Sequence, residues 1–113
     1  MMYNEGTIIA LSTAPGSGAI AIIRLSGEDA ISKTDLFFKS KAGKKLSESG
    51  GYSISYGDLV EKDEVIDEVV VSVYKAPHSY TGENIIEISC HGSIYIQQRI
   101  LSLFTNAGVR LAS

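Results

Sequence analysis

The chain has 113 residues, of which 44% are apolar and 20% are charged, and its formal net charge is −3. This length allows one domain with a thin core, and the composition is ordinary for a globular protein. The negative charge argues against nucleic-acid binding by the domain as a whole, so an RNA contact would need a local patch. A lone cysteine, Cys90, excludes an internal disulfide, and no signal peptide or membrane-spanning apolar run is visible, so the sequence favours the cytoplasm.

Two β-prone runs open the chain. Thr7–Ala14 and Ala19–Leu25 are rich in β-branched and apolar residues, and the turn residues of Pro15–Gly18 separate them. The short connection predicts that the two strands are antiparallel neighbours. The second run is apolar on both faces until Arg24, which predicts a central strand covered on both sides.

A helix is expected next, starting near Ser26, which we expect to cap it ahead of the acidic residues Glu28 and Asp29. The apolar contacts of this helix with the sheet are expected from residues at helical spacing, namely Ala30, Thr34, Phe37 and Phe38.

The segment Lys39–Gly51 is polar and rich in Lys, Ser and Gly, so we expect an exposed loop. Its four lysines, Lys39, Lys41, Lys44 and Lys45, form a short basic run. A solvated loop is the favoured interpretation of that run, and a binding site is the less favoured one.

The second half predicts three strands and a helix. The strands are Tyr52–Val60, Glu68–Tyr74 and Ile85–Cys90, joined by a turn at 61–64 and a loop at 76–84. In the first of them the expected buried face comprises Ile54, Tyr56 and Val60. A helix from about Ser93 to Ala107 carries the apolar stripe Ile96, Ile100, Leu103, Phe104 and Ala107, with Gln97, Gln98, Ser102 and Asn106 facing away. We expect Gly108 to end this helix before a short extended segment. The order of elements predicts an α+β fold with a mixed sheet and two helices.

Several common sites are disfavoured by the spacing of their residues. Gly16-Ser17-Gly18 lacks the third glycine and the following helix of a dinucleotide site, and no phosphate loop for GTP or ATP is present. Cys90 and His91 are adjacent on a strand and therefore point to opposite faces, so they do not form a nucleophile–base pair. With one cysteine and two histidines, zinc has too few ligands. We expect Cys90 to lie in the core and His91 to make a local structural contact.

Arg24 and Glu87 are the charged residues that the strands leave unexplained. Glu87 lies between Ile86 and Ile88 and needs either solvent or a partner. One interpretation is an ion pair between Arg24 and Glu87, or an exposed edge position for Glu87. The other is that both line one pocket, where the carboxylate accepts hydrogen bonds from a guanidine-like edge and the guanidinium binds carbonyl or carboxylate oxygens. A pterin ring has such a donor edge, and folates add a carbonyl and a carboxylate tail.

Three runs in the chain resemble known motifs in the same order. They are T-I-I-A-L-S-T-A-P-G-S-G-A-I-A-I-I-R-L-S-G (Thr7–Gly27), S-Y-T-G-E-N-I-I-E-I-S-C-H-G (Ser79–Gly92) and A-G-V-R-L-A (Ala107–Ala112). Together they resemble the N-terminus of the tRNA-modification GTPase family called MnmE or TrmE. The resemblance covers nearly the whole chain. It departs from the usual motifs at Ala14, where the family usually has proline, and at Ala19 and Ser93, where it usually has glycine.

The resemblance implies that residues 1–113 are the N-terminal folate-binding and dimerisation domain of a longer protein, with a fold similar to the tetrahydrofolate-binding fold of aminomethyltransferases. It implies that Arg24 and Glu87 contact 5-formyltetrahydrofolate or a related reduced folate, and that a further lysine of the family's site lies beyond this chain. Family members are homodimers that use GTP, Mg²⁺ and K⁺ in other domains. They act with the flavoprotein MnmG on C5 of the wobble uridine U34 of tRNA.

The expectation is therefore a folate-binding module with no catalytic residue, no metal ligand and no GTPase activity of its own. Two alternatives remain open. One is a purely structural homodimerisation domain with an incomplete folate site. The other, a free-standing aminomethyltransferase-like enzyme, is disfavoured by the length of the chain.

Overall fold

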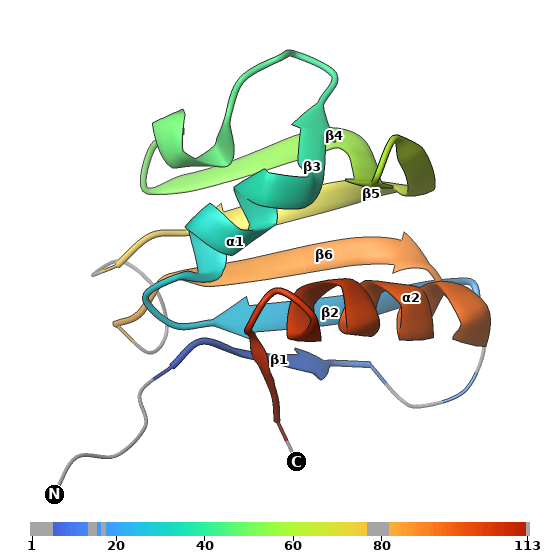
Figure 1. Ribbon diagram of the computed structural model, residues 1–113. Helices are drawn as coiled ribbons and strands as arrows, with labels where there is room; N and C mark the ends of the chain where they lie inside the picture. Colours follow the sequence, from blue (N-terminus) through green and yellow to red (C-terminus); the bar gives the residue numbers. More distant parts are fainter. Residues whose placement is uncertain (1–5, 14–15, 17, 77–81, 113) are drawn as a thin grey trace, which may run out of the picture.

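A seven-stranded sheet with two α-helices on one face makes up the described part of the chain (Figure 1). The computed structural model describes residues 6–13, 16, 18–76 and 82–112. The elements are β1 (Ile8–Leu11), β2 (Ile20–Ser26), α1 (Ala30–Phe37), β3 (Phe38–Ser40), the 3₁₀ turn η1 (Leu46–Glu48), β4 (Tyr52–Glu61), β5 (Glu64–Tyr74), β6 (Ile85–His91), α2 (Ile94–Thr105) and β7 (Arg110–Leu111). The strand order is β3-β4-β5-β6-β2-β1-β7, and only the β1–β7 pair is parallel. The predicted α+β fold with a mixed sheet is confirmed, as is the antiparallel pairing of β1 and β2.

The core lies between the sheet and the two α-helices. Alternate residues of the central strands point toward the helices and are fully buried, as the two-residue period of a strand requires. They include Ile23, Leu25, Val71, Val73, Ile86 and Ile88. Ile100 and Phe104 of α2 pack on this layer, and the ring of Phe104 meets that of Phe37 edge to face with centroids 5.4 Å apart. Cys90 is buried in the same layer, as predicted.

Strand β2 is interior to the sheet, but only one of its faces is covered, so the predicted burial on both sides is wrong. Figure 1 shows α1 and α2 on the same side of the sheet, with no helix on the other side. Ile20 is 66% exposed on that second face, and Ile22 and Arg24 are half-buried there. The apolar residues on this face of β2 therefore have no covering layer within the described chain.

The start of α1 also differs from the prediction. Ser26 belongs to β2, and its hydroxyl donates to Glu83 Oε1 at 2.9 Å instead of capping the helix. The helix begins after Asp29, whose own backbone N–H donates to Thr7 Oγ1 at 2.8 Å. Phe38, which the helical spacing assigned to α1, is buried as the first residue of β3.

The buried face of β4 is opposite to the one expected. Ile54 and Tyr56 are exposed, whereas Gly57 and Leu59 are buried. The cause lies in the pairing of β4 with β3, because a Cβ on Gly57 would lie 2.2 Å from the carbonyl oxygen of Lys39. Small residues must face that contact, and a one-residue change of parity moves every side chain of the strand to the other face.

Helix α2 follows the predicted stripe, with one exception. Ser93 caps it by accepting a hydrogen bond from Ile96 N at 3.0 Å, and Gly108 follows its end with φ +98°. Gln97, expected to face solvent, is buried. Its Nε2 donates to the carbonyl oxygens of Gly16 and Gly92, both at 3.0 Å. The side chain thus joins the connection after β1 to the end of β6.

The lysine-rich segment is more ordered than a polar composition indicates. It contains β3 and η1, and the side chain of Leu46 is fully buried. The carboxylate of Asp35 accepts hydrogen bonds from the backbone N–H groups of Leu46 and Ser47 at 2.8 and 3.1 Å. Expectations that fall on residues 14, 15, 17 and 77–81 lie outside the described residues. No helix in the described ranges is long and apolar enough to cross a membrane.

Candidate functional site: the open face of the sheet

The face of the sheet opposite the helices, which we call the open face, combines exposed apolar side chains with one ion pair. Strand pairing places the side chains of Ile54, Ser72, Glu87 and Arg24 in a row across β4, β5, β6 and β2. The neighbouring rows add apolar residues, and exposed or half-buried apolar side chains on this face are Ile20, Ile22, Tyr52, Tyr56, Val70 and Tyr74. Several large apolar side chains exposed together on one face are typical of a surface that binds a ligand or a partner.

Arg24 and Glu87 face each other directly on β2 and β6. Arg24 Nη2 donates to Glu87 Oε2 at 3.1 Å, and the two side chains are 37% and 25% exposed. The ion pair that the residues alone allowed is therefore present. A partly exposed pair of this kind contributes at most about 1 kcal/mol to folding, so stability gives little reason to keep charge in the middle of an apolar face.

Hydrogen-bonding capacity remains in this pair. Arg24 Nε is buried and makes no hydrogen bond to any described residue. Glu87 Oε2 is the carboxylate oxygen that meets Arg24, which leaves Oε1 outside that hydrogen bond. An unpaired buried donor costs free energy, so an acceptor that reached it would be favoured.

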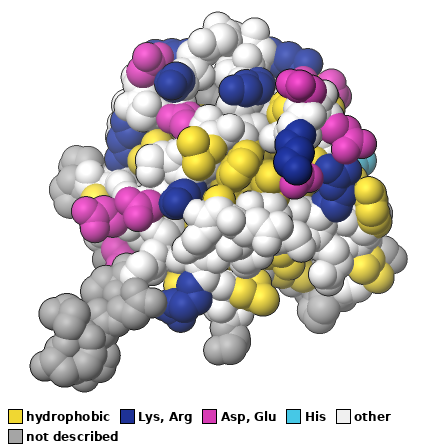
Figure 2. All heavy atoms as spheres, viewed as in Figure 1, with side chains coloured by type: hydrophobic (Ala, Val, Ile, Leu, Met, Phe, Trp, Pro, Cys, Tyr) yellow, Lys and Arg dark blue, Asp and Glu magenta, His cyan; other side chains and the backbone are white. Residues whose placement is uncertain are grey.

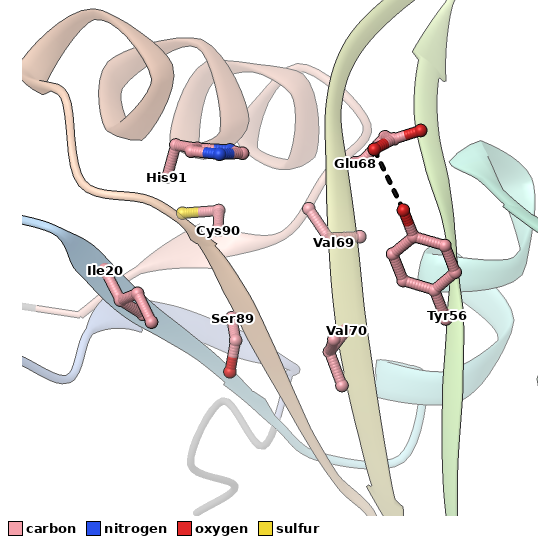
Figure 3. Close-up of a pocket in the computed structure, with 8 residues that line it drawn as sticks. All are labelled: Ile20, Tyr56, Glu68, Val69, Val70, Ser89, Cys90 and His91. Carbon is pink, nitrogen blue, oxygen red and sulfur yellow. Dashed lines mark hydrogen bonds between the residues drawn. The ribbon is translucent and has the colours of Figure 1, made fainter.

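A hollow of about 180 Å³ lies further along β6, at Ser89–His91, where β5 and β6 separate (Figure 3). Neither Arg24 nor Glu87 lines it. The β5–β6 pairing ends at Val70 and Ser89, and beyond them Val69 and Cys90 line the opening. In Figure 3, Ile20 borders the hollow from β2, and the Tyr56 hydroxyl points at Glu68. Ligand sites for molecules of drug size usually measure roughly 300–1,000 Å³. The hollow alone is therefore too small for a folate.

His91 ends β6 at the rim of this hollow and is held by Asp67. Its backbone N–H donates to Asp67 Oδ2 at 2.8 Å, and its Nδ1 lies 2.7 Å from Asp67 Oδ1. The expected local structural contact is confirmed. Cys90 points into the core, where burial raises the pKa of its thiol to about 11. Among the described residues no cluster of His, Cys, Asp and Glu could hold a metal ion.

Sequence reasoning missed the polar cluster at the β4 side of the open face. The Tyr56 hydroxyl donates to Glu68 Oε1 at 2.9 Å, and this hydrogen bond is the main reason why the pKa of Tyr56 is raised. Lys41 Nζ lies 3.5 Å from Asp58 Oδ2 and 3.7 Å from Glu68 Oε2. The sequence predicts Tyr56 on the buried face of its strand, so it does not predict a hydrogen bond between Tyr56 and Glu68 on the exposed face. The alternation of Ser53, Ser55 and Gly57 was the available signal, because small residues mark a close approach.

The structure is an α+β domain in which two helices cover one face of a mixed sheet and leave the other face open. Residues 7–113 match the family described as "GTP-binding protein TrmE N-terminus", and the chain belongs to that family.

Curated relatives from several bacteria agree with this assignment. The chain is 53% identical over 108 residues to the tRNA modification GTPase MnmE of Parabacteroides distasonis, with 94% of the chain covered. It is 49% and 44% identical, each over 111 residues and 98% of the chain, to the proteins of the same name from Flavobacterium johnsoniae and Clostridioides difficile. The chain spans 23–24% of the length of these relatives.

Proposed function

We propose that this chain binds a reduced folate, such as 5-formyltetrahydrofolate, on its open face through Arg24 and Glu87. The observation that carries the proposal is a charged pair with unused hydrogen-bonding capacity in the centre of an exposed apolar surface. The family assignment supports it, because the two residues fall on the motif positions to which the resemblance gave that role.

The residues present fit the chemistry of a folate. A carboxylate in the position of Glu87 accepts from the amino and ring N–H groups of a pterin, and the Arg24 guanidinium donates to a carbonyl or carboxylate oxygen. The apolar side chains around the pair, such as Ile22 and Ile54, offer contact area for a flat ring, and Ser72 and Ser89 add hydroxyl groups. This mixture of mostly apolar area with a few polar groups is the usual composition of a cofactor site.

We further propose that the open face is also where two copies of the chain form a homodimer. Tyr52 and Ile54, which are 58% and 60% exposed, are large side chains that a partner would cover. The hollow of about 180 Å³ is too small for the whole ligand, so a second copy facing it would enlarge and close the site.

At the level of the whole protein, the proposal is a module of a tRNA-modifying GTPase that acts in the cytoplasm. The curated relatives are named tRNA modification GTPases and are about four times longer than this chain. GTP, Mg²⁺ and K⁺ would bind outside these 113 residues, and MnmG would be the partner with which C5 of U34 is modified. This chain would have no GTPase activity of its own.

Titration of 5-formyltetrahydrofolate by calorimetry tests the role of Glu87. We expect Glu87→Gln, which keeps the shape and removes the charge, to weaken affinity by on the order of a hundredfold, since a charged hydrogen-bonded contact contributes roughly 2–3 kcal/mol. The matched control is Glu61→Gln, a carboxylate that is likewise ion-paired with an arginine, Arg99, and does not line the hollow. Equal affinity of wild type and Glu87→Gln would refute the assignment.

A structural homodimerisation domain with an incomplete folate site is the second candidate, favoured by the same exposed apolar residues. Sedimentation of the chain over a hundredfold range of concentration, with and without folate, separates the two. A dimer that binds no folate supports the second candidate, whereas a monomer that binds folate argues against it.

A further inference from the structure

We propose that the segment from Lys39 to Lys45, which we call the lysine segment, is a contact surface for the phosphate backbone of RNA. This inference rests on the proposed function only in one respect, the identification of the bound polyanion as RNA. The observations that carry it are the distribution of cations over the molecule and the shape of the surface under them.

Most cations outside the lysine segment already have partners. Arg24 and Arg99 form ion pairs with carboxylates, and the ammonium groups of Lys33 and Lys75 donate to backbone carbonyls. By contrast, the ammonium groups of Lys39, Lys44 and Lys45 form no ion pair with any residue that the structure describes. In Figure 2, the upper part of the view, where Figure 1 places β3 and the segment leading to η1, carries several Lys and Arg side chains with Asp and Glu side chains among them. Unneutralised positive charge is thus concentrated in one short stretch of a chain whose net charge is −3.

These three lysines surround a shared depression of about 370 Å³. Asp35, Phe38, Ser40 and Gly43 complete its lining. The Asp35 carboxylate is engaged by the backbone N–H groups of Leu46 and Ser47. The buried side chain of Leu46 and the pairing of β3 with β4 fix both ends of the segment. The lysines are therefore presented by a shaped surface and not by a freely moving loop.

A concave surface bordered by several ammonium groups fits a ridge of phosphates better than it fits a flat bilayer. Lysine binds phosphate as a point charge, and several such contacts release counterions from a nucleic acid whatever its sequence. RNA is the polyanion we infer, because the relatives are named for modification of tRNA. Because the net charge of the chain is −3, an RNA contact requires a local group of cations such as the lysine segment.

The test is fluorescence anisotropy of labelled tRNA with the 113-residue chain between about 20 and 200 mM salt. We expect Lys44→Gln/Lys45→Gln to weaken tRNA binding roughly tenfold at the lowest salt and to lower the log–log salt slope by about 2. The matched control is Lys62→Gln/Arg110→Gln, which removes the same charge from two exposed cations outside the lysine segment. The control variant should retain most of the wild-type affinity and slope.

Equal losses in the two variants, or no tRNA binding by the wild type at the lowest salt, would overturn the proposal. So would binding to vesicles of anionic phosphatidylserine together with no binding to tRNA. Affinity for 5-formyltetrahydrofolate should be unchanged in Lys44→Gln/Lys45→Gln, because the lysine segment is separate from Arg24 and Glu87. Failure of the RNA inference is thereby distinguishable from failure of the folate proposal, which Glu87→Gln tests alone.

Discussion

Replacement of Gly92 by alanine tests the packing at the end of β6. Its backbone oxygen accepts hydrogen bonds from Gly18 N and from the side chain of Gln97, both at 3.0 Å. A Cβ on Gly92 would lie 2.2 Å from Gly18 O and 2.7 Å from the carbonyl carbon of Gly18. Both atoms belong to the backbone, so the segments around Gly18 and Gly92 would have to move apart by roughly 1 Å to restore van der Waals contact.

The expected cost follows from these contacts. Overpacking a close contact costs about 1–3 kcal/mol, and losing the hydrogen bond between Gly18 and Gly92 adds about 1 kcal/mol. We therefore expect Gly92→Ala to lower the free energy of unfolding by about 2–4 kcal/mol. At about 4 °C per kcal/mol for a domain of this size, the melting temperature falls by about 8–16 °C.

The assay is thermal and urea unfolding followed by circular dichroism, with Gly18→Ala as the control. Gly18 lies in the same contact, but a Cβ placed on it meets no atom within 4 Å. We expect that variant to stay within about 0.5 kcal/mol of wild type. Similar melting temperatures for Gly92→Ala and wild type, or equal losses in both variants, would show that the close contact at Gly92 does not limit stability.

Two further predictions concern the core and the lysine segment. Because burial raises the pKa of Cys90 to about 11, the unfolded chain loses this thiol proton at lower pH than the folded chain. Stability should fall as pH rises from about 9 toward 11, more steeply in wild type than in Cys90→Ala; parallel urea-unfolding profiles would contradict this. Leu46→Ala should lower the free energy of unfolding by about 2–5 kcal/mol, and Leu36→Ala, at a 59% exposed position, by less than about 0.5 kcal/mol. Equal urea midpoints for these two variants would show that Leu46 does not fix the segment.

Periodicity predicted most of the secondary structure. The strand at Ile85, the helix that begins after Ser93 and the apolar stripe through Ile100 were all found in the structure, because a strong period and a good cap act locally. The core position of Cys90 followed from strand alternation in the same way.

The errors arose where tertiary contacts decide the local structure. In β4 the apolar side chains Ile54 and Tyr56 face outward, because the close approach of β3 at Gly57 fixes the parity of the strand. Gln97 is buried by a hydrogen-bond partner far away in the sequence, at Gly16, which no helical pattern reveals. Periodicity cannot report the register or the partner of an element, so these features needed the fold.

The candidate site was predicted only in part. The pairing of Arg24 with Glu87 was one of two interpretations that the residues allowed, and the register of β2 and β6 brings the two side chains together. The exposed apolar surface around them was not predicted, since β2 was expected to be covered on both faces. An ion pair within a covered sheet needs no ligand. Because the face around Arg24 and Glu87 is open, a ligand can reach the pair.

An NMR titration of the ¹⁵N-labelled chain with 5-formyltetrahydrofolate tests folate binding on the open face most directly. We predict that amide shifts concentrate on the open face, at Arg24, Ser72, Glu87 and Ser89. The amide shifts of Ser102 in α2 and of Asn106, which follows the end of α2, should change little, because both residues lie on the helix side of the sheet. Saturable shifts on the open face that disappear in Glu87→Gln would support the account. Shifts confined to the helix side, or none at millimolar folate, would contradict it.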